Sequence, residues 1–506
     1  MQKNIKQLTQ LDQILTKVAE FTHSTVAAEQ LAASPILTDI TAVRDQLALT
    51  AEAHQLLLNS VMLTFFNLDD LKVIQTKLDQ GMLLNATQLG VLGTFLTSGQ
   101  RLMTTLRHHA KLAPKLVALM TPVTGLSSLQ QRLTTEIKHD QVADQATPEL
   151  TQVRQKISQQ RQQVQAALTQ FVQKHPQAIQ GRRLITRNDH VCVQLKANYK
   201  TRFPGQIIDQ SGTGSTVFFE PKMAAQRGQI LAELVAEESA EVYQILATLT
   251  GDVQERWPQL IQNQQLISQL DQLMAKGQYA LSTRSCLPAL NTTQHLKIVN
   301  GRHPLLGTNA VPLNVELAPK QGLMITGANS GGKTVVLKTI ALFAQMVQVG
   351  LEVPADLGTE IPVFTQIWLD IGDNQSLAAQ LSTFAAEMTT LVTMTDGIQP
   401  NALVLLDEIG SGTDPEEGSA LSIAIIDYLR AAGATIIATT HFSAIKSYAV
   451  ACPTFVTATM AFDRKTLEPT YHLLLHQVGA SEAIWLAERL GLAPAILTAA
   501  RQRLEK

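Results

Sequence analysis

The chain has few of the features that mark secreted or membrane-spanning proteins. Its three cysteines, Cys192, Cys286 and Cys452, are odd in number and far apart. That spacing fits neither a disulfide framework nor a metal site. We therefore expect all three cysteines to be buried and to pack like small apolar side chains, and we expect the protein to lie in a reducing compartment. The N-terminus lacks the apolar segment of a signal peptide, and no run approaches ~18 uninterrupted apolar residues. We therefore expect a soluble, cytoplasmic protein with no membrane contact.

Aromatic residues and net charge are also low. Aromatic residues make up 5% of the 506 positions, whereas 45% are hydrophobic. Such a composition, rich in Gln, Leu and Ala, favours long helices. The 40 basic and 42 acidic residues give a net charge of −2, so any basic surface for nucleic acid must be local. A chain of this length predicts about three domains.

The most informative stretch joins a short apolar run, residues 323–326, to a helix-like run, residues 335–347. Between them, residues 327–334 fit the pattern G-x-x-x-x-G-K-[S/T] without a mismatch. Its glycines let the backbone turn its N–H groups toward phosphate oxygens, and the following helix N-terminus attracts the same anions. The alternative is a glycine-rich turn that matches the pattern by chance. A predicted strand before the turn and a predicted helix after it argue against that alternative.

This stretch predicts a site for ATP and Mg²⁺. Lys333 is expected on the β- and γ-phosphates, and the Thr334 hydroxyl on Mg²⁺. The predicted nucleotide-binding residues of the turn are Gly327, Ala328, Asn329, Ser330, Gly331, Gly332, Lys333 and Thr334.

Two later apolar runs end in residues that suit hydrolysis. The run 402–406 leads into Asp407 and Glu408, and the run 435–439 leads to His441. We expect Asp407 to hold Mg²⁺, and Glu408 to orient or deprotonate the attacking water. His441 is a candidate γ-phosphate contact, with a purely structural histidine as the alternative. Lys333, Glu408 and His441 are thus the predicted catalytic residues.

Strand-like and helical runs alternate from residue 296 onward. This order predicts an α/β domain with a parallel sheet, whose ligands bind at the carboxyl ends of the strands.

The first 135 residues predict a helical scaffold, because apolar residues recur at three- and four-residue spacing. Breaks are expected near Pro35, Asp70 and Pro122, and no catalytic cluster occurs here. Residues 148–171 form one narrow apolar stripe of coiled-coil type. A second long helix should begin near residue 224 and be interrupted at Pro258. The two helices suggest an antiparallel arm with a small domain at its tip.

The segment between these helices, residues 180–223, predicts short strands at 191–195, 205–209 and 215–219. Residues 181–222 carry seven basic and three acidic side chains, a local charge of seven minus three, or +4. We weigh a phosphate-backbone contact evenly against an ordinary solvated surface. The candidate nucleic-acid contacts are Arg182, Arg183, Arg187, Lys196, Lys200 and Arg202.

Several stretches, taken together, resemble the MutS family of ABC-type ATPases over residues 296–492. They are residues 302–304, 327–334, 353–355, 370–376, 381–384, 407–418 and 462–471. The resemblance implies a homodimer of ATPase domains arranged head to tail. Ser382 and Thr383 would then approach the γ-phosphate across the interface, Asn329 would contact it in cis, and Gln375 would join the nucleotide site.

Residues 203–221 are similar to the clamp segment of the second bacterial branch of MutS proteins. The resemblance implies an ATP-dependent clamp on branched or recombination DNA. It does not imply a direct mismatch reader, because the domains that read a mismatch have no room in this chain. A ribosome-associated ATPase that rescues stalled or collided ribosomes, with ribosome or rRNA as partner, is the alternative. A structural relic whose ATPase only stabilises the dimer is a third. The chain stops at Lys506, so we expect no Smr nuclease activity.

The predicted fold class is mixed. An all-α core with a coiled-coil arm carries a small β clamp and is followed by an α/β ABC-type P-loop ATPase domain. The expected divisions are a helical core or lever (1–147), an outgoing arm helix (148–179), a β clamp (180–223), a returning arm helix (224–290) and an ATPase domain with C-terminal dimerisation helices (291–506).

Overall fold

The structure is a computed structural model that describes residues 2–188, 190–327, 331–371, 380–411, 413–463, 466, 468–479, 483–489 and 491–504. The chain forms two compact units, each assembled from separate stretches. The first comprises Met1–Phe65, Met103–Pro122 and Leu266–Lys506, and the second comprises Phe66–Leu102 and Val123–Gln265. Within the described ranges, no helix combines the length and apolar character needed to cross a membrane.

The first unit is built on a six-stranded sheet with the order β12-β13-β14-β10-β15-β16. Its strands are β10 (Gly322–Thr326), β12 (Ile367–Asp370), β13 (Leu403–Leu406), β14 (Thr435–Thr439), β15 (Phe455–Asp463) and β16 (Glu468–Leu475). All neighbours are parallel except β15 and β16. Every residue of β10, β13 and β14 is buried, as expected for parallel strands covered on both faces. The predicted parallel sheet is confirmed.

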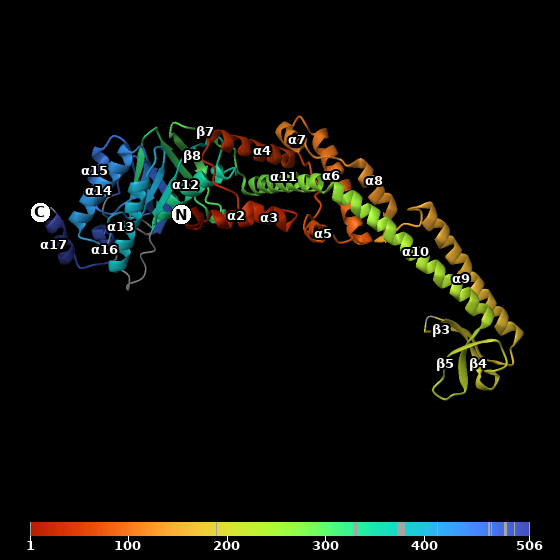
Figure 1. Cartoon of the computed structure of the whole chain (residues 1–506). Helices are drawn as coiled ribbons and strands as arrows, with labels where there is room; N and C mark the ends of the chain where they lie inside the picture. The colour runs from red at the N-terminus through yellow and green to blue at the C-terminus, as the bar shows by residue number, and fades with distance from the viewer. Residues whose placement is uncertain are drawn as a thin grey trace. The chain divides into compact units, whose positions relative to one another are not determined.

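Alternate residues of these strands enter two separate cores. Leu323 and Ile325 face a core shared with α12 (Lys333–Gln348), whereas Met324 faces one shared with α14 (Pro415–Ala431) and α15 (Ser443–Ala451). Figure 1 shows α12 on one side of the sheet and α14 and α15 on the other. Thirteen residues of α12 are buried, because a helix that is apolar on nearly all sides must lie inside the protein.

A second sheet, which we did not predict, precedes and follows α12. It has the order β7-β11-β8-β9 and contains β7 (Ala289–Asn291), β8 (Leu296–Gly301), β9 (Leu313–Leu317) and β11 (Glu360–Pro362). The remaining helices of this unit include α1 (Gln2–Leu8), α2 (Leu11–Ala19), α3 (Thr25–Ala32), α4 (Ile40–Leu58), α7 (Pro114–Met120), α13 (Gln380–Gly397), α16 (Ala483–Arg489) and α17 (Pro494–Leu504).

The C-terminal end of α12 is held by a buried lysine of α11 (Trp257–Thr283). Lys276 Nζ donates a hydrogen bond to the carbonyl of Val349, the residue that ends α12, at 2.6 Å. Burial lowers the pKa of Lys276 to about 8. On the adjacent residue, the Gly350 carbonyl accepts a bond of 2.7 Å from the Thr50 hydroxyl of α4.

The backbones of α4 and α11 approach closely beside this lysine. A Cβ added to Gly277 would lie 2.8 Å from the backbone nitrogen of His54. The His54 ring in turn pairs with Glu352 at 2.8 Å between Nδ1 and Oε2, and both side chains are largely buried. Polar contacts therefore tie α4 and α11 to the segment that follows α12.

The second unit contains two long helices that lie alongside each other (Figure 1), α9 (Pro148–Lys174) and α10 (Lys222–Glu255). Thr147 begins α9 by accepting a hydrogen bond from Leu150 N, with Pro148 in the first turn, a favoured N-terminal pattern. The predicted interruption at Pro258 is confirmed, since α10 ends at Glu255 and α11 begins at Trp257. The rest of this unit includes α5 (Asp70–Asp79), the start of α6 (Ala86–His108), α8 (Ser127–Glu136), β1 (Ile137–Lys138) and β2 (Gln141–Val142).

A four-stranded antiparallel sheet connects α9 to α10, in the order β3-β4-β6-β5. Its strands are β3 (Ile179–Arg187), β4 (His190–Lys196), β5 (Gly205–Gln210) and β6 (Thr216–Pro221). Leu168 of α9 packs with Val193, Leu195 and Phe219 in one buried cluster. The three predicted strands in this segment are confirmed, and β3 is an additional one.

The cysteines only partly follow expectation. Cys192 and Cys286 are buried, and all three are free thiols. Cys452, at the C-terminal end of α15, is half-buried, and its Sγ accepts a hydrogen bond from Arg430 Nη1 at 3.2 Å. The expectation of a buried apolar role was therefore wrong for Cys452.

Candidate nucleotide site

Three side chains meet where β10, β13 and β14 end. Asp407, directly after β13, accepts hydrogen bonds on both carboxylate oxygens. The Thr334 hydroxyl donates to Oδ2 at 2.6 Å, and the Thr439 hydroxyl donates to Oδ1 at 2.5 Å. The backbone N–H of Glu408 donates to Thr439 Oγ1 at 2.8 Å. Parallel pairing of β13 with β14 brings Leu406 opposite Ala438, which places these groups at one edge of the sheet.

Lys333 points into the same edge. Its Nζ donates to the carbonyl of Gly327 at 2.8 Å and lies 3.9 Å from Glu408 Oε1. The side chain is 2% exposed, and this burial, which disfavours the charged form, lowers its pKa despite the nearby carboxylates of Glu408 and Asp407. The ammonium is therefore held inside the site rather than in solvent.

Two residues of the site, Gly332 and Glu408, have a positive backbone φ angle. Gly332, which begins α12, has φ 91°, and a Cβ there would lie 3.0 Å from the ring of Tyr471. Only glycine meets both conditions. Glu408 also has a positive φ, 54°, a conformation that costs a residue with a Cβ roughly 1–2 kcal/mol. Strain of this kind concentrates at functional sites.

The oxygens present suit Mg²⁺. A hydroxyl from Thr334 and a carboxylate from Asp407 are hard oxygen donors, the type that Mg²⁺ prefers, and Mg²⁺ usually takes few protein ligands beside water and substrate phosphates. Among the residues that the structure describes, no group of three or more His, Cys, Asp and Glu could hold a metal. Asp370 ends the neighbouring strand β12, and burial, with a smaller contribution from Asp407, raises its pKa to about 6.

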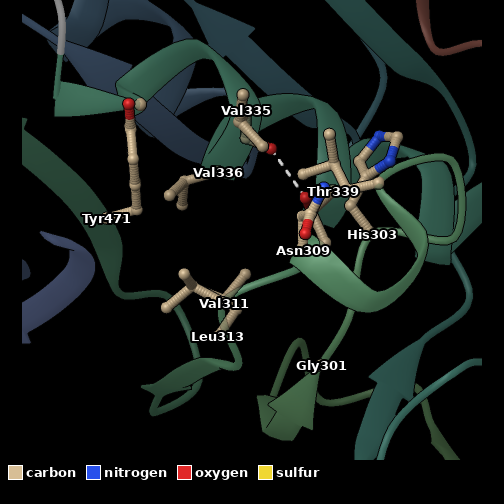
Figure 2. A pocket seen from close by; sticks show the side chains of 11 residues that line it. Gly301, His303, Asn309, Val311, Leu313, Val335, Val336, Thr339 and Tyr471 are labelled. Carbon is tan, nitrogen blue, oxygen red and sulfur yellow. Dashed lines mark hydrogen bonds between the residues drawn. The ribbon is translucent and has the colours of Figure 1, made fainter.

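A cavity of about 240 Å³ opens beside the N-terminal turn of α12. Figure 2 shows Tyr471 of β16 on one side and His303, Asn309 and Thr339 on the other. The lining is mostly apolar and also includes Gly301, Leu306, Val311, Leu313, Gly332, Val335 and Val336. Burial, together with the charge of Lys338, lowers the pKa of His303 to about 4, so its ring is neutral near pH 7.

The structure brings some predicted residues together and leaves others apart. Five of the predicted residues converge where β10, β13 and β14 end, namely Gly327, Lys333, Thr334, Asp407 and Glu408. His441 is exposed and its ring lies beside that of Phe442, so its predicted role stays a prediction. Ala328, Asn329, Ser330 and Gln375 lie outside the described residues, as do the side chains of Ser382 and Thr383.

Two features of the site escaped the sequence reasoning. Thr439 was identified only as part of a strand, although its hydroxyl joins Asp407 to the backbone of Glu408. The cavity walls come from a loop near residue 309, from α12 and from β16, so no local motif joins them. The family-like stretches 302–304, 327–334 and 462–471 each contain a residue of this lining, His303, Gly332 and Tyr471, but nothing in the sequence showed that they meet.

The predicted basic residues lie on the β3–β6 sheet and its loops. Arg182, Arg183, Lys200 and Arg202 are exposed. Arg187 lies 3.8 Å from Asp209 and over the ring of Phe218, and Lys196 donates to the carbonyl of Gln177 at 2.9 Å. Arg202 also lies over the ring of Tyr199, with its Cζ 5.3 Å from the ring centroid. Arg187, Lys196 and Arg202 are thus partly engaged within the unit.

A parallel sheet with a glycine-rich turn, a Lys-Thr pair at the start of the next helix and an acidic pair on a neighbouring strand is the arrangement of P-loop proteins. Residues 323–506 match the family model described as MutS domain V. The chain belongs to the MutS family.

Several curated relatives are proteins named Endonuclease MutS2. The chain is 33% identical over 515 residues to that of Ruminiclostridium cellulolyticum, a match covering 100% of this chain and 65% of the relative. It is 36% identical over 490 residues to that of Symbiobacterium thermophilum, covering 96% and 62%. For Acetivibrio thermocellus the identity is 37% over 372 residues, covering 73% and 47%. The chain therefore spans less than two thirds of the length of these relatives.

Proposed function

We propose that this chain binds and hydrolyses ATP with Mg²⁺ and uses the ATP cycle to control a clamp on DNA. The observation that supports ATP chemistry most directly is the contact of Thr334 with Asp407, beside the buried ammonium of Lys333. A hydroxyl, a carboxylate and a lysine at one sheet edge are the groups that hold a nucleoside triphosphate and its metal.

Each residue has a distinct task in this proposal. Lys333 leaves its contact with the Gly327 carbonyl to neutralise the β- and γ-phosphates, and Thr334 and Asp407 hold Mg²⁺. The metal, when bound, neutralises charge that builds up on the phosphate oxygens. Glu408 orients the attacking water and accepts its proton. Thr439 fixes the Asp407 carboxylate and the Glu408 backbone, so both carboxylates are pre-positioned.

The cavity beside α12 is proposed to receive the base and ribose. Its walls are apolar, as in most small-molecule sites, and it adjoins Gly332 at the start of the phosphate-binding helix. A neutral His303 suits an uncharged base better than a protonated ring would, because a buried charge without a partner is costly.

The DNA-binding role rests on the β3–β6 sheet and on the family. Four exposed basic side chains, Arg182, Arg183, Lys200 and Arg202, suit contacts with phosphates that carry no sequence information. We propose a homodimer that closes on branched DNA in response to ATP and does not read mismatches.

Replacing Glu408 by Gln tests the ATPase proposal. The variant should bind ATP with wild-type affinity and lose most turnover, because the amide cannot accept the proton of the attacking water. Equilibrium binding and single-turnover phosphate release measure the two properties separately. Glu237→Gln, an exposed position on α10, is the matched control and should keep full activity. Wild-type turnover in Glu408→Gln would contradict the assignment.

A competition experiment tests the choice of partner. Glu408→Gln protein with ATP, and then with ADP, is offered four-way-junction DNA, linear duplex and collided ribosomes at near-physiological salt, since such affinities depend steeply on salt. A nucleotide-dependent preference for the junction supports the DNA clamp. A preference for ribosomes would overturn it in favour of a ribosome-associated ATPase.

A further inference from the structure

The threonine that precedes the glycine-rich turn joins three segments of the first unit. Thr326 is the last residue of β10 and is fully buried. Its hydroxyl donates a hydrogen bond to the carbonyl of Ala458 on β15 at 3.0 Å, and it accepts one from the backbone N–H of Gly479 at 2.9 Å. One hydroxyl can form both bonds because it has one proton and two lone pairs. The end of β10 is thereby fixed to β15 and to the segment that follows β16.

Gly479 lies against the first glycine of the turn. A Cβ added to Gly479 would lie 3.4 Å from the Cα of Gly327 and 2.6 Å from the hydroxyl oxygen of Thr459. The second distance is too short for a carbon atom to occupy, so a larger residue fits only if the segment moves. Residues 476–479 are thus packed on the turn, and α16 begins four positions later, at Ala483.

The carbonyl that these contacts hold belongs to the proposed nucleotide site. Gly327 follows directly on Thr326, and its carbonyl accepts from Lys333 Nζ at 2.8 Å. In the proposed ATP cycle, this contact is released when phosphates bind. A shift of Thr326 would move the Gly327 carbonyl and so change where the Lys333 ammonium lies before ATP arrives.

We propose that Thr326 is a positioning residue of the nucleotide site and that residues 476–479 transmit the state of this site to α16. This link, which rests on the proposed binding of ATP, begins when phosphates draw Lys333 away from the Gly327 carbonyl. The packing of Gly327 on Gly479 then changes, and the segment that leads into α16 changes with it. A continuous set of contacts is one physical route for such coupling, and the contacts run without a gap from Lys333 to Gly479.

Trp485 of α16 can report this link. Its ring centroid lies 6.4 Å from that of Phe462 on β15, and the two rings are nearly perpendicular. A change in the position of α16 alters this packing and therefore the fluorescence of Trp485. The contribution of the other tryptophans is removed by subtracting the ATP-dependent signal of Trp485→Phe protein.

Thr326→Val tests the positioning role, because valine keeps the shape of threonine and lacks the hydroxyl. We expect ATP affinity about 10-fold lower, the effect of losing a buried hydrogen bond. The single-turnover rate of bound ATP should change much less, because Asp407 and Glu408 are unaltered. Thr326→Ser keeps the hydroxyl and should restore most of the affinity. Thr457→Val, at a half-buried position on β15, is the matched control and should bind ATP as the wild type does.

The link to α16 is tested in the Glu408→Gln background, in which ATP is not consumed. At saturating ATP, the Trp485 signal should be present in the parent protein and largely lost in Thr326→Val. It should also be lost in Gly479→Ala, whose added Cβ displaces residues 476–479 while Thr326 is unaltered. Gly125→Ala is the control, because a Cβ there meets nothing within 4 Å.

The possible results separate this inference from the proposed function. If Thr326→Val and Gly479→Ala are folded by circular dichroism, bind ATP as the parent does and keep the Trp485 signal, the inference is wrong and the proposed ATPase stands. If the signal alone is the same in all proteins at saturating ATP, transmission to α16 is excluded. If the wild type does not bind ATP, the proposed function fails and this inference fails with it.

Discussion

At the scale of single residues, the hydroxyl of Thr439 is the least conspicuous group in the site and one of the best connected. It donates to Asp407 and accepts from the backbone of Glu408. A hydroxyl can do both at once because it has one proton and two lone pairs. Thr439 therefore fixes the proposed metal ligand and the proposed base relative to each other.

Thr439→Val should lower the rate of ATP hydrolysis about 10- to 100-fold, the equivalent of roughly 1.5–3 kcal/mol for hydrogen bonds that involve a carboxylate. ATP affinity should change less, because Lys333 and the glycine-rich turn are unaltered. Steady-state kinetics with separate nucleotide binding measures this split.

Thr435→Val is the control on the same strand. Thr435 is 1% exposed, and its hydroxyl has no partner among the described residues. Removing a buried, unsatisfied hydroxyl is neutral or stabilising, so this variant should hydrolyse ATP normally. A loss of activity in Thr435→Val equal to that in Thr439→Val would point to general damage to β14.

The role of Thr439 could not be predicted from the sequence, whereas that of Lys333 could. The spacing of residues 327–334 is local, and a local motif specifies a local backbone geometry. The contact of Thr439 with Asp407 depends instead on which strands pair and in which register. That information is spread over the whole sheet and is carried by no single stretch.

At the scale of secondary-structure elements, α12 is held at both ends by charge. Its N-terminus carries Lys333 toward the proposed phosphate site, and its C-terminal carbonyl at Val349 accepts from Lys276. A cation at a helix C-terminus is favourable, but burial opposes the charged form and lowers the pKa of Lys276 to about 8.

This buried lysine predicts a specific dependence of stability on pH. The unfolded lysine titrates near 10.4, so between pH 8 and that value the unfolded chain binds more protons than the folded one. Stability of the wild type should therefore rise with pH relative to Lys276→Met, by up to about 3 kcal/mol. Urea unfolding at pH 7.5 and pH 10 measures the difference.

The wild type and Lys276→Met share every other lysine, so the contributions of those lysines to the pH dependence cancel in the comparison. Lys111→Met, at an exposed position, should show no such divergence from wild type. A Lys276→Met curve that stays parallel to the wild-type curve from pH 7.5 to 10 would show that burial does not lower the pKa of Lys276.

The long elements were easier to predict than the short ones. The α9 and α10 helices and the buried strands β10, β13 and β14 follow from apolar periodicity over many residues. By contrast, β7 and β11 have three residues each and pair across about 70 intervening positions, Ala289 with Glu360. Three residues carry no usable periodicity, and such pairing is decided by the surrounding core.

At the scale of the whole molecule, the proposed DNA interaction depends on charge at four exposed positions in one unit. Replacing Arg182, Arg183, Lys200 and Arg202 together by Ala should weaken binding to every DNA tested. It should also reduce the slope of log affinity against log salt by about 0.9 for each phosphate that the protein no longer neutralises. ATP turnover without DNA should be unchanged, because these residues and the nucleotide site lie in different units.

A second quadruple variant controls for net charge. It replaces four exposed residues of the other unit, namely Lys17, Arg44, Lys111 and Lys320. Changing these four to Ala removes the same total charge from the chain. If both quadruple variants show the same reduction in salt dependence, the DNA interaction is not specific to the β3–β6 sheet.

If ATP alters DNA affinity, the effect must also run in reverse. Thermodynamic linkage requires that DNA change ATP affinity by the same factor in the non-hydrolysing Glu408→Gln protein. Measuring the DNA affinity with and without ATP, and the ATP affinity with and without junction DNA, should give matching ratios. A ratio of one in both directions would mean that the nucleotide site and the DNA surface act independently.

The positive φ of Glu408 has a consequence for how this gene can decay. The backbone there would accept Gly or Asn more easily than Glu, so selection for catalysis and selection for a relaxed main chain oppose each other. In a duplicated copy freed from the need for hydrolysis, the carboxylate would be among the first groups to drift. A paralogue with Asn or Gly at this position and an intact glycine-rich turn would bind the nucleotide but would no longer hydrolyse it.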